Sequence, residues 1–198
     1  MNKSERFWDR TSKYHDNIAK DKAFNRTLEI TKKYLKQSDI ILDYACATGL
    51  YSTELTKNVK EIHGIDISSK MIEVANEKAA PNTIFTKASI FEKYEKETFD
   101  VILAFNVLHF LEEEQKVMKR INELLKPEGI FISVTPCLGE KNSFLGVLAI
   151  LLTKIGILPY IKRFKISELE KLININFNVI KTIELTPKQN LIVAKCIT

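Results

Sequence analysis

Two aspartates stand at the ends of apolar runs. Asp43 closes "IILD" and is followed by a loop of small residues, 45–49, whereas Asp66 closes "EIHGID". Small residues let a ligand approach the backbone, and the amides at the start of a following helix favour a negative group. Asp43 would repel a pyrophosphate, and the sequence has neither the G-x-G-x-x-G pattern nor the G-K-[ST] of a phosphate loop. A zwitterion fits better, because its carboxylate can meet the amides while its ammonium meets Asp43.

The spacing of the two aspartates adds a second constraint. Asp66 follows Asp43 by 23 residues (66 − 43), close to the spacing of about 20 at which a carboxylate binds ribose hydroxyls in open α/β sheets. The ligand indicated is therefore an amino acid joined to a ribose. S-adenosylmethionine contains both groups, together with a sulfonium that Asp43 does not repel.

Short β-rich runs alternate with helical patterns, which predicts an α/β fold with a parallel sheet wrapped by helices. The predicted helices span residues 51–57, 68–78 and 112–125, with one or two more within residues 1–36. Only "TPKQ" separates the last two strands, so one of them is expected to run antiparallel. The predicted strands are "IILDY", "EIHGID", "TIFTK", "FDVILAF", "GIFISVT", "FNVIKTIEL" and "NLIVAKC".

Four loops then share the carboxyl edge of this sheet, where open α/β folds bind their ligands. They follow Asp43, Asp66, Lys87 and Phe105. The competing interpretation is that Asp43 caps the next helix or bonds loop amides, a common role for aspartate at a strand end, and that Asp66 caps the helix after it. The combination of both aspartates with the small-residue loop favours the ligand role.

The sequence resembles the class I S-adenosylmethionine-dependent methyltransferases, in particular the small-molecule group with a D-x-G-C-G-T-G loop. The segments "LDYACATG", "GIDISSKMIEVANEK", "FDVILAFNVLHFL" and "LLKPEGIFISVTP" follow one another in the order of that family. The resemblance implies a Rossmann-like, doubly wound mixed sheet of seven strands, with the last strand antiparallel and helices at the N-terminus. It also implies a single domain over residues 1–198, with a helical cap at 1–36 and an insertion at 138–165 that could serve as a lid.

The same resemblance assigns roles to individual residues. Asp43 and the loop after it would hold the methionine end of the cofactor, and Asp66 would hold the ribose. The residues after the second, third and fourth strands would meet the adenine and line the site near the sulfonium. The implied cofactor-binding residues are Tyr14, Asp43, Ala45, Cys46, Ala47, Gly49, Asp66, Ile67, Ser89, Ile90, Asn106 and Leu108.

Three residues depart from the family pattern. Ala45 and Ala47 stand where glycine is usual, and an alanine that needs a positive φ costs on the order of 1 kcal/mol. Ser89 replaces a frequent aspartate, and its hydroxyl accepts a hydrogen bond from the adenine amino group more weakly. These departures leave open a non-catalytic binding or interaction module whose cofactor site is weakened.

His109 follows the fourth predicted strand and is the candidate catalytic residue. Imidazole titrates near neutral pH, so it can act as a general base toward the acceptor. The competing interpretation is a histidine that bonds the backbone and shapes the loop. Cys46 is interpreted as a packing residue, because nothing near it in the sequence favours a thiolate.

Residues 144–152 form the longest apolar run, which is shorter than the roughly 20 residues needed to span a bilayer. The run is apolar on every side. We rank its interpretations in the order of packing against the N-terminal helices, a lid over an apolar acceptor, and peripheral contact with a membrane.

The amino-acid composition narrows the class of protein further. With 45% hydrophobic and 28% charged residues, the chain reads as an ordinary globular protein. The net charge of +5 comes from scattered lysines without a basic block that alternates with aromatics, which argues against a nucleic-acid partner. Three cysteines far apart in sequence predict neither disulfides nor a metal site and favour a cytoplasmic setting. The polar start "MNKSERFWDR" does not read as a signal peptide.

The sequence therefore predicts a cytoplasmic methyltransferase that moves the methyl group of S-adenosylmethionine to a small acceptor by in-line displacement. Positioning and desolvation are its main tasks, because the sulfonium already makes the methyl group reactive. A nucleic-acid methyltransferase would use the same cofactor residues, but "NVLH" stands where an N-P-P-Y type motif would follow the fourth strand. The acceptor and the oligomeric state are not predicted.

Overall fold

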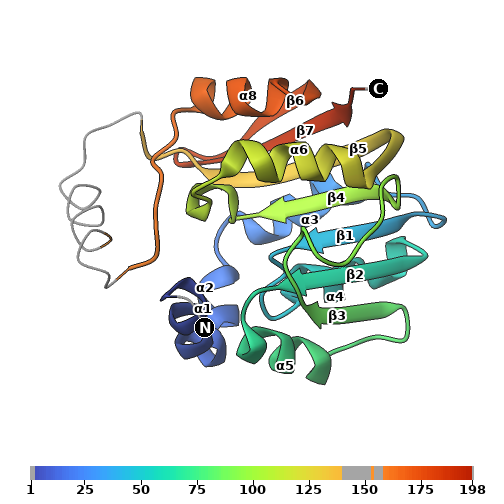
Figure 1. The fold of residues 1–198 in the computed structure, drawn as a ribbon, viewed down its shortest axis with the longest axis vertical. Coiled ribbons are helices and arrows are strands. Elements are labelled where there is room, and N and C mark those ends of the chain that lie inside the picture. Colours follow the sequence, from blue (N-terminus) through green and yellow to red (C-terminus); the bar gives the residue numbers. More distant parts are fainter. Residues whose placement is uncertain (1–2, 140–152, 154–157, 198) are drawn as a thin grey trace.

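A computed structural model describes residues 3–139, 153 and 158–197 of the chain. Seven strands form one sheet in the order β3-β2-β1-β4-β5-β7-β6 (Figure 1). β7 runs antiparallel to both β5 and β6, whereas the other neighbours are parallel. This confirms the predicted mixed sheet with its last strand antiparallel. The strands are β1 Ile40–Tyr44, β2 Glu61–Asp66, β3 Thr83–Lys87, β4 Phe99–Phe105, β5 Leu125–Pro136, β6 Phe177–Thr186 and β7 Gln189–Cys196.

The helices between the strands agree with the sequence pattern, with shifts at their ends. The Ser68 hydroxyl accepts a hydrogen bond from the Met71 amide at 3.1 Å and so caps α5, as expected of a serine at that position. The helix expected at 112–125 is α6, which ends where β5 begins. The α-helices and 3-10 turns are α1 Lys3–Thr11, η1 Ser12–Tyr14, α2 His15–Ala19, α3 Phe24–Lys32, α4 Leu50–Leu55, η2 Thr56–Asn58, α5 Ser69–Glu77, η3 Leu108–Phe110, α6 Glu114–Leu124 and α8 Ile166–Asn174.

The N-terminal segment folds into three helices, so the expectation of one or two was wrong. The 3-10 turn η1 separates α1 from α2. A second break follows α2, where the Asp21 carboxylate accepts a hydrogen bond from the Ala23 amide at 2.8 Å. A side chain that bonds its own backbone two residues on stabilises a turn in place of a continuous helix.

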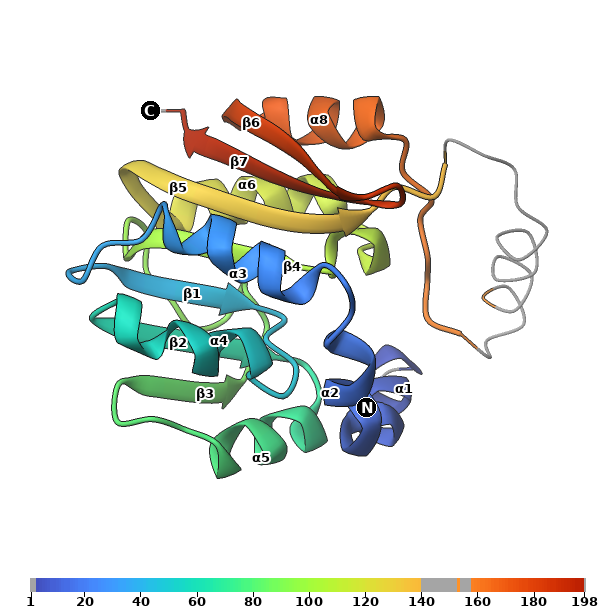
Figure 2. The ribbon, with the colours of Figure 1, turned by 180° about the vertical axis from the view of Figure 1, so that it is seen from behind.

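The sheet has a hydrophobic core on each face. Successive strand residues point to opposite faces, and β1 delivers the fully buried Ile41 and Leu42 to different clusters. Ile41 packs with Leu28 of α3. Helices α3 and α4 cover the face of the sheet that is seen in Figure 2. Leu42 belongs to the cluster that holds Met118 of α6, on the face seen in Figure 1. The two cores cover the faces of the sheet, so its carboxyl edge is left to carry and position the loops.

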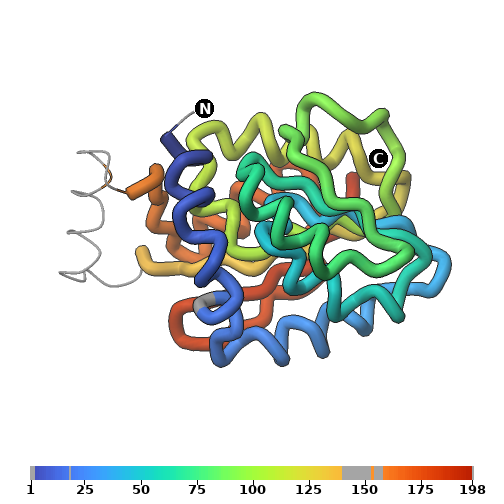
Figure 3. Tube along the Cα trace, turned by 90° about the horizontal axis from the view of Figure 1, so that it is seen from below, coloured from blue at the N-terminus to red at the C-terminus, as the bar shows by residue number. Residues whose placement is uncertain are grey.

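Helices α1 and α2 lie beyond these two layers, although Ala19 of α2 packs against the core that contains Ile41. They lie beyond the arrowheads of β1 and β2, at the carboxyl edge of the sheet, in both ribbon views (Figures 1 and 2). Seen from below, the N-terminal segment runs across this edge (Figure 3). The segment is therefore placed to cover any ligand bound at the strand ends.

The apolar run at 144–152, and most of the insertion expected at 138–165, lie outside the described residues. In the described part of the chain, no helix is long and apolar enough to cross a membrane.

Candidate active site

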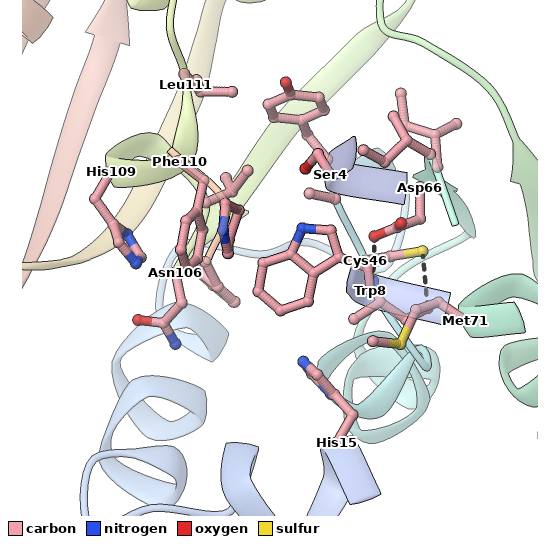
Figure 4. A pocket seen from close by; sticks show the side chains of 18 of the residues that line it. Ser4, Trp8, His15, Cys46, Asp66, Met71, Asn106, His109, Phe110 and Leu111 are labelled. Carbon is pink, nitrogen blue, oxygen red and sulfur yellow. Dashed lines mark hydrogen bonds between the residues drawn. The ribbon is translucent and has the colours of Figure 1, made fainter. Parts of the chain in front are cut away.

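A cavity of about 590 Å³ lies at the carboxyl ends of β1, β2 and β4. Loops after these strands form one side, and the N-terminal helices contribute Phe7, Trp8 and His15 to the other (Figure 4). The position agrees with the rule that open α/β sheets bind ligands at this edge.

In the loop after β1, every second residue from Ala45 to Gly49 has a φ in the left-handed region. Ala45 has φ 57°, Ala47 has φ 48° and Gly49 has φ 72°. A side chain at Gly49 would also meet the Phe85 ring, since an added Cβ would lie 2.7 Å from that ring. Gly49 is therefore required by both conformation and space. The two alanines do adopt the positive φ that costs on the order of 1 kcal/mol each.

Asp43 lies at the end of β1 and is 3% exposed. The Ser52 hydroxyl donates a hydrogen bond to its carboxylate at 2.6 Å. Burial raises the pKa of Asp43 to about 7, and the nearby Asp66 charge adds to the rise, while the Ser52 hydrogen bond opposes it. Gly49 occupies the N-cap of α4, so Asp43 is not the cap of that helix. A cationic group in the cavity would favour its ionised form.

Asp66 lies at the end of β2 and ties two backbone segments together. Its carboxylate accepts hydrogen bonds from the amides of Ala47 at 3.0 Å and Ser68 at 2.8 Å. Burial nevertheless raises the pKa of Asp66 to about 6, against the lowering effect of these backbone hydrogen bonds. Ser68, not Asp66, caps α5. A carboxylate oxygen has more than one lone pair, so Asp66 can still accept from ligand hydroxyls.

These donors and acceptors suit an amino acid joined to a ribose. Two carboxylates, at Asp43 and Asp66, can meet an ammonium group and ribose hydroxyls. The loop between them brings backbone close to the ligand. Among the described residues, no group of three or more His, Cys, Asp or Glu side chains is placed to hold a metal ion. The residues present therefore fit S-adenosylmethionine.

Most residues assigned from the sequence come together around this cavity. They come from the ends of four strands that are far apart in the sequence. The predicted residues that line it are Asp43, Ala45, Cys46, Ala47, Asp66, Ile67, Ser89, Ile90, Asn106 and His109.

Three predicted residues do not line the cavity. Tyr14 is 67% exposed and belongs to η1, where the change from α1 to a 3-10 turn alters the direction of the side chains. Leu108 is fully buried in the core between the sheet and α6. Gly49 shapes the loop from behind, against Phe85. The geometry thus gives Gly49 a backbone role and places Tyr14 and Leu108 outside the lining of the cavity.

His109 lies in η3 and is 8% exposed. Burial lowers the pKa of His109 to about 4, so its ring is neutral near pH 7. Its Nδ1 atom has no hydrogen-bond partner among the described residues. The backbone carbonyl of His109 accepts a hydrogen bond from the Lys162 amide at 2.7 Å. The residue therefore both holds a neighbouring segment and presents a neutral imidazole to the cavity.

Further residues line the cavity that the sequence had not marked as ligand contacts. Trp8 contacts Phe110 edge to face, with ring centroids 5.0 Å apart. His15 and Gln189 also line the cavity. Trp8 and His15 belong to the helical cap expected at 1–36, where only Tyr14 was assigned to the ligand, and Gln189 carries no sequence signal because it starts an ordinary strand.

Acidic side chains hold the N-terminal helices on the edge of the sheet. The Ser68 hydroxyl donates a hydrogen bond to Asp9 at 2.6 Å. Asp16 forms an ion pair with Lys78 at 2.8 Å and accepts a hydrogen bond from the Thr48 hydroxyl. Both acids bond residues that stand beside the candidate cofactor loops, which couples the cap to them.

The chain matches the family described as "Methyltransferase domain" over residues 35–158. It therefore belongs to this family, that of the class I S-adenosylmethionine-dependent methyltransferases. The match covers the loops after β1, β2, β3 and β4, and the N-terminal cap lies before it.

Individual relatives of the chain are also named as methyltransferases. An uncharacterised methyltransferase of Schizosaccharomyces pombe is 28% identical over 66% of this chain and 53% of its own length. The ubiquinone biosynthesis O-methyltransferase of Rickettsia bellii is 31% identical over 61% of this chain and 52% of its own length. The chain thus spans about half the length of these curated relatives.

Solved structures share the fold over more of the chain. The crystal structure of a SAM-dependent methyltransferase from Aquifex aeolicus has a TM-score of 0.77 and 17% sequence identity, and the match covers 96% of this chain and 98% of that one. The likeness supports the arrangement of the sheet and helices.

Proposed function

We propose that this protein transfers the methyl group of S-adenosylmethionine to a small, largely apolar acceptor. The observation that carries the proposal is the pair of buried carboxylates, Asp43 and Asp66, which face one cavity from the ends of adjacent strands. Family membership supports the same cofactor.

In this proposal each end of the cofactor has its own partners. Asp43 and the loop backbone hold the methionine end, and Asp66 holds the ribose hydroxyls. Ile67, which is 39% exposed, offers an apolar surface to the adenine, and Ser89 and Ile90 stand at its edge. When bound, the cofactor supplies an activated methyl group on a sulfonium.

The protein supplies position and a dry environment for this chemistry. Helices α1 and α2 cover the cavity and exclude water, which strengthens the electrostatic interactions inside it. Asn106 lies at the end of β4 and faces the same cavity. The neutral ring of His109 can accept a proton from the acceptor.

The acceptor side of the cavity is mainly apolar. Phe7, Trp8, Phe110, Leu111 and Leu158 line it, which supports a small apolar acceptor. A relative named for ubiquinone biosynthesis is consistent with an acceptor of that character.

The test is isothermal titration of the purified protein with S-adenosylmethionine and S-adenosylhomocysteine. Micromolar binding, of the order of −8 kcal/mol, is expected for the unaltered chain. Asp66→Asn should weaken it about tenfold or more, because a charge-assisted hydrogen bond is lost. The matched control is Asp100→Asn, which changes an aspartate in β4 that bonds Ile40 and Lys126 outside this cavity.

The positive φ of Ala45 and Ala47 supports one alternative to the methyltransferase function, a non-catalytic binding module. If neither ligand binds to the unaltered chain, the strained loop has closed the site, and the protein is a non-catalytic binding module. Binding that survives Asp66→Asn unchanged would instead refute the assignment of the ribose to Asp66.

A further inference from the structure

Beyond the residues proposed for the cofactor, the cavity has a second end with its own chemistry. Figure 4 shows Asp66, Cys46 and Met71 on one side, and Asn106 with His109 on the other. We infer that this second end, built by Asn106, His109, Phe110 and Trp8 with Gln189 behind Asn106, binds an uncharged aromatic ring that carries a hydroxyl group, which is the methyl acceptor. The inference rests on the proposed function and adds the substrate class to it.

Aromatic side chains at this end meet one another edge to face. Trp8 lies between the two groups of residues in Figure 4 and contacts Phe110 with centroids 5.0 Å and planes 77° apart. On another part of the wall, Tyr51 contacts Phe105 with centroids 4.8 Å and planes 66° apart. Edge-to-face and offset geometries favour a further aromatic ring over an aliphatic group of the same size.

The charges on the described part of the wall disfavour an anionic acceptor. Of the described residues that line the cavity, none is Lys or Arg, and the ionisable acids are Asp21, Asp43 and Asp66. A buried anion without a cationic partner is costly. A carboxylate or phosphate on the acceptor would find no cationic side chain among these described residues, whereas a neutral ring needs none.

Asn106 is held so that its amide nitrogen is left for a ligand. The Gln189 side-chain amide donates a hydrogen bond to Asn106 Oδ1 at 3.0 Å. The Asn106 backbone amide donates to the Val134 carbonyl at 2.7 Å, and φ is 55°. Gln189 takes one lone pair of Oδ1 and so fixes the orientation of the amide, which leaves the N–H donors of Asn106 for the cavity. Gln189 is thus a positioning residue for Asn106.

Two histidines supply the complementary acceptors. His109 is more than nine-tenths buried, and His15 stands on the cap side of the same cavity. The Nδ1 atoms of both lack a hydrogen-bond partner in the described part of the chain. A hydroxyl both donates and accepts, so it can bond a neutral imidazole and the Asn106 amide at once. Neither a bare hydrocarbon ring nor a methyl ether can do both.

The groups at this end of the cavity account for the bonds and the proton of the transfer step. The bond from the hydroxyl oxygen to the methyl carbon forms as the bond from sulfur to that carbon breaks, and the electron pair of the broken bond remains on sulfur. The hydroxyl proton passes to the neutral imidazole of His109 and from there to solvent. No oxidant or reductant is needed.

The experiment uses the whole protein saturated with S-adenosylhomocysteine, whose binding is measured first. 4-Ethylphenol is then titrated beside three matched probes: 4-ethylcyclohexanol tests the ring, 4-ethylbenzoate the charge and 4-ethylanisole the hydroxyl. The phenol should bind about tenfold or more tightly than each of the other three. Trp8 is the only tryptophan in the sequence, so the phenol should also change the tryptophan fluorescence.

Variants separate this end of the cavity from the cofactor end. Phe110→Leu and Gln189→Leu should each weaken phenol binding about tenfold and leave the affinity for S-adenosylhomocysteine unchanged. Ile180→Ala, on the exposed edge strand β6, should change neither affinity. A Gln189→Leu effect on both affinities would mean a merely structural role for that residue and would overturn its assignment.

Two results would contradict the inference in different ways. If S-adenosylhomocysteine binds but 4-ethylbenzoate or 4-ethylcyclohexanol binds as tightly as the phenol, or the phenol does not bind, the acceptor class is wrong and the proposed function stands. If S-adenosylhomocysteine itself does not bind, the proposed function fails and the acceptor class fails with it.

Discussion

The backbone amide of Ala47 donates a hydrogen bond to the Asp66 carboxylate at 3.0 Å. Together with the hydrogen bond from the Cys46 amide to the Ile65 carbonyl at 3.0 Å, this contact joins the loop after β1 to the end of β2. It fixes the loop in a conformation that puts a positive φ on an alanine, and it leaves a buried carboxylate beside the cavity. Burial where the two strand ends meet raises the pKa of Asp66, and the hydrogen bond from Ala47 opposes that rise.

Replacing Ala45 or Ala47 by glycine should stabilise the protein. Each alanine has a positive φ, and relief of that strain is worth about 1 kcal/mol. Denaturant unfolding should show this gain for each variant, and titration should show tighter cofactor binding. The matched control is Ala104→Gly in β4, where a fully buried alanine lies outside the positive-φ set and the change should destabilise. Equal effects at all three positions would contradict the strain argument.

Gly49→Ala should have the opposite effect to Ala47→Gly, although both positions belong to one loop. Its φ is 72°, and the new methyl group would lie 2.7 Å from an atom of the Phe85 ring. Conformational cost and overpacking together predict a loss of about 1–3 kcal/mol in the free energy of unfolding, measured by denaturant titration. Phe85→Leu in the same variant should recover part of the loss, and no recovery would place the cost in the backbone alone.

Affinity for S-adenosylmethionine should rise with pH. Burial holds the pKa of Asp43 at about 7 and that of Asp66 at about 6 without ligand. The cationic cofactor binds the ionised carboxylates, so below these values binding must release protons. The association constant should fall up to about tenfold per pH unit for each linked proton as the pH drops through this range. Isothermal titration at several pH values measures the slope.

The stability of the ligand-free protein should fall as the pH rises, opposite to the affinity for S-adenosylmethionine. Both folded-state pKa values lie above the ordinary value of 3.8 for an aspartate. The two groups therefore contribute stability that is fully present below about pH 4 and is lost as pH rises through 6 and 7. Asp43→Asn should flatten both profiles, in melting temperature and in affinity. A variant that keeps the full slope of either would show that another group is responsible.

Asp16→Asn should loosen the N-terminal cap. The change removes the ion pair with Lys78 and weakens the hydrogen bond from Thr48. Because the pair is partly exposed, we expect only a few-fold weaker cofactor binding, together with faster proteolysis within the first twenty residues. The comparison is Glu73→Gln, which breaks an exposed pair with Lys70 inside α5 and should change neither measurement.

Local sequence determined the sheet well and the cap poorly. Buried parallel strands need continuous apolar runs, and each run predicted as a strand is a strand in the structure. The loops after Asp43 and Asp66 could therefore be placed at one edge of the sheet from the sequence. The cap depends on where a helix breaks, and the breaks at η1 and Asp21 involve one or two hydrogen bonds that leave no periodic signal. Tyr14 was consequently expected at the ligand, whereas Trp8 lines the cavity.

Contacts across the whole chain could not be predicted at all. Gln189 bonds Asn106 only because β7 returns antiparallel beside β5 and so brings its first residue to the carboxyl edge. The pattern of the strand predicts burial and direction and says nothing about which side chain it meets. The same holds for Trp8 against Phe110, which joins the first helix to the turn after β4.

The most direct test is the crystal structure of the complex with S-adenosylhomocysteine. The account predicts ribose hydroxyls within hydrogen-bond distance of the Asp66 carboxylate, the ligand ammonium at Asp43 or the loop carbonyls, and adenine on Ile67. The space between Asn106 and Phe110 should remain free for an acceptor. A ligand that binds outside this cavity, or in it with the ribose away from Asp66, would contradict the central claim.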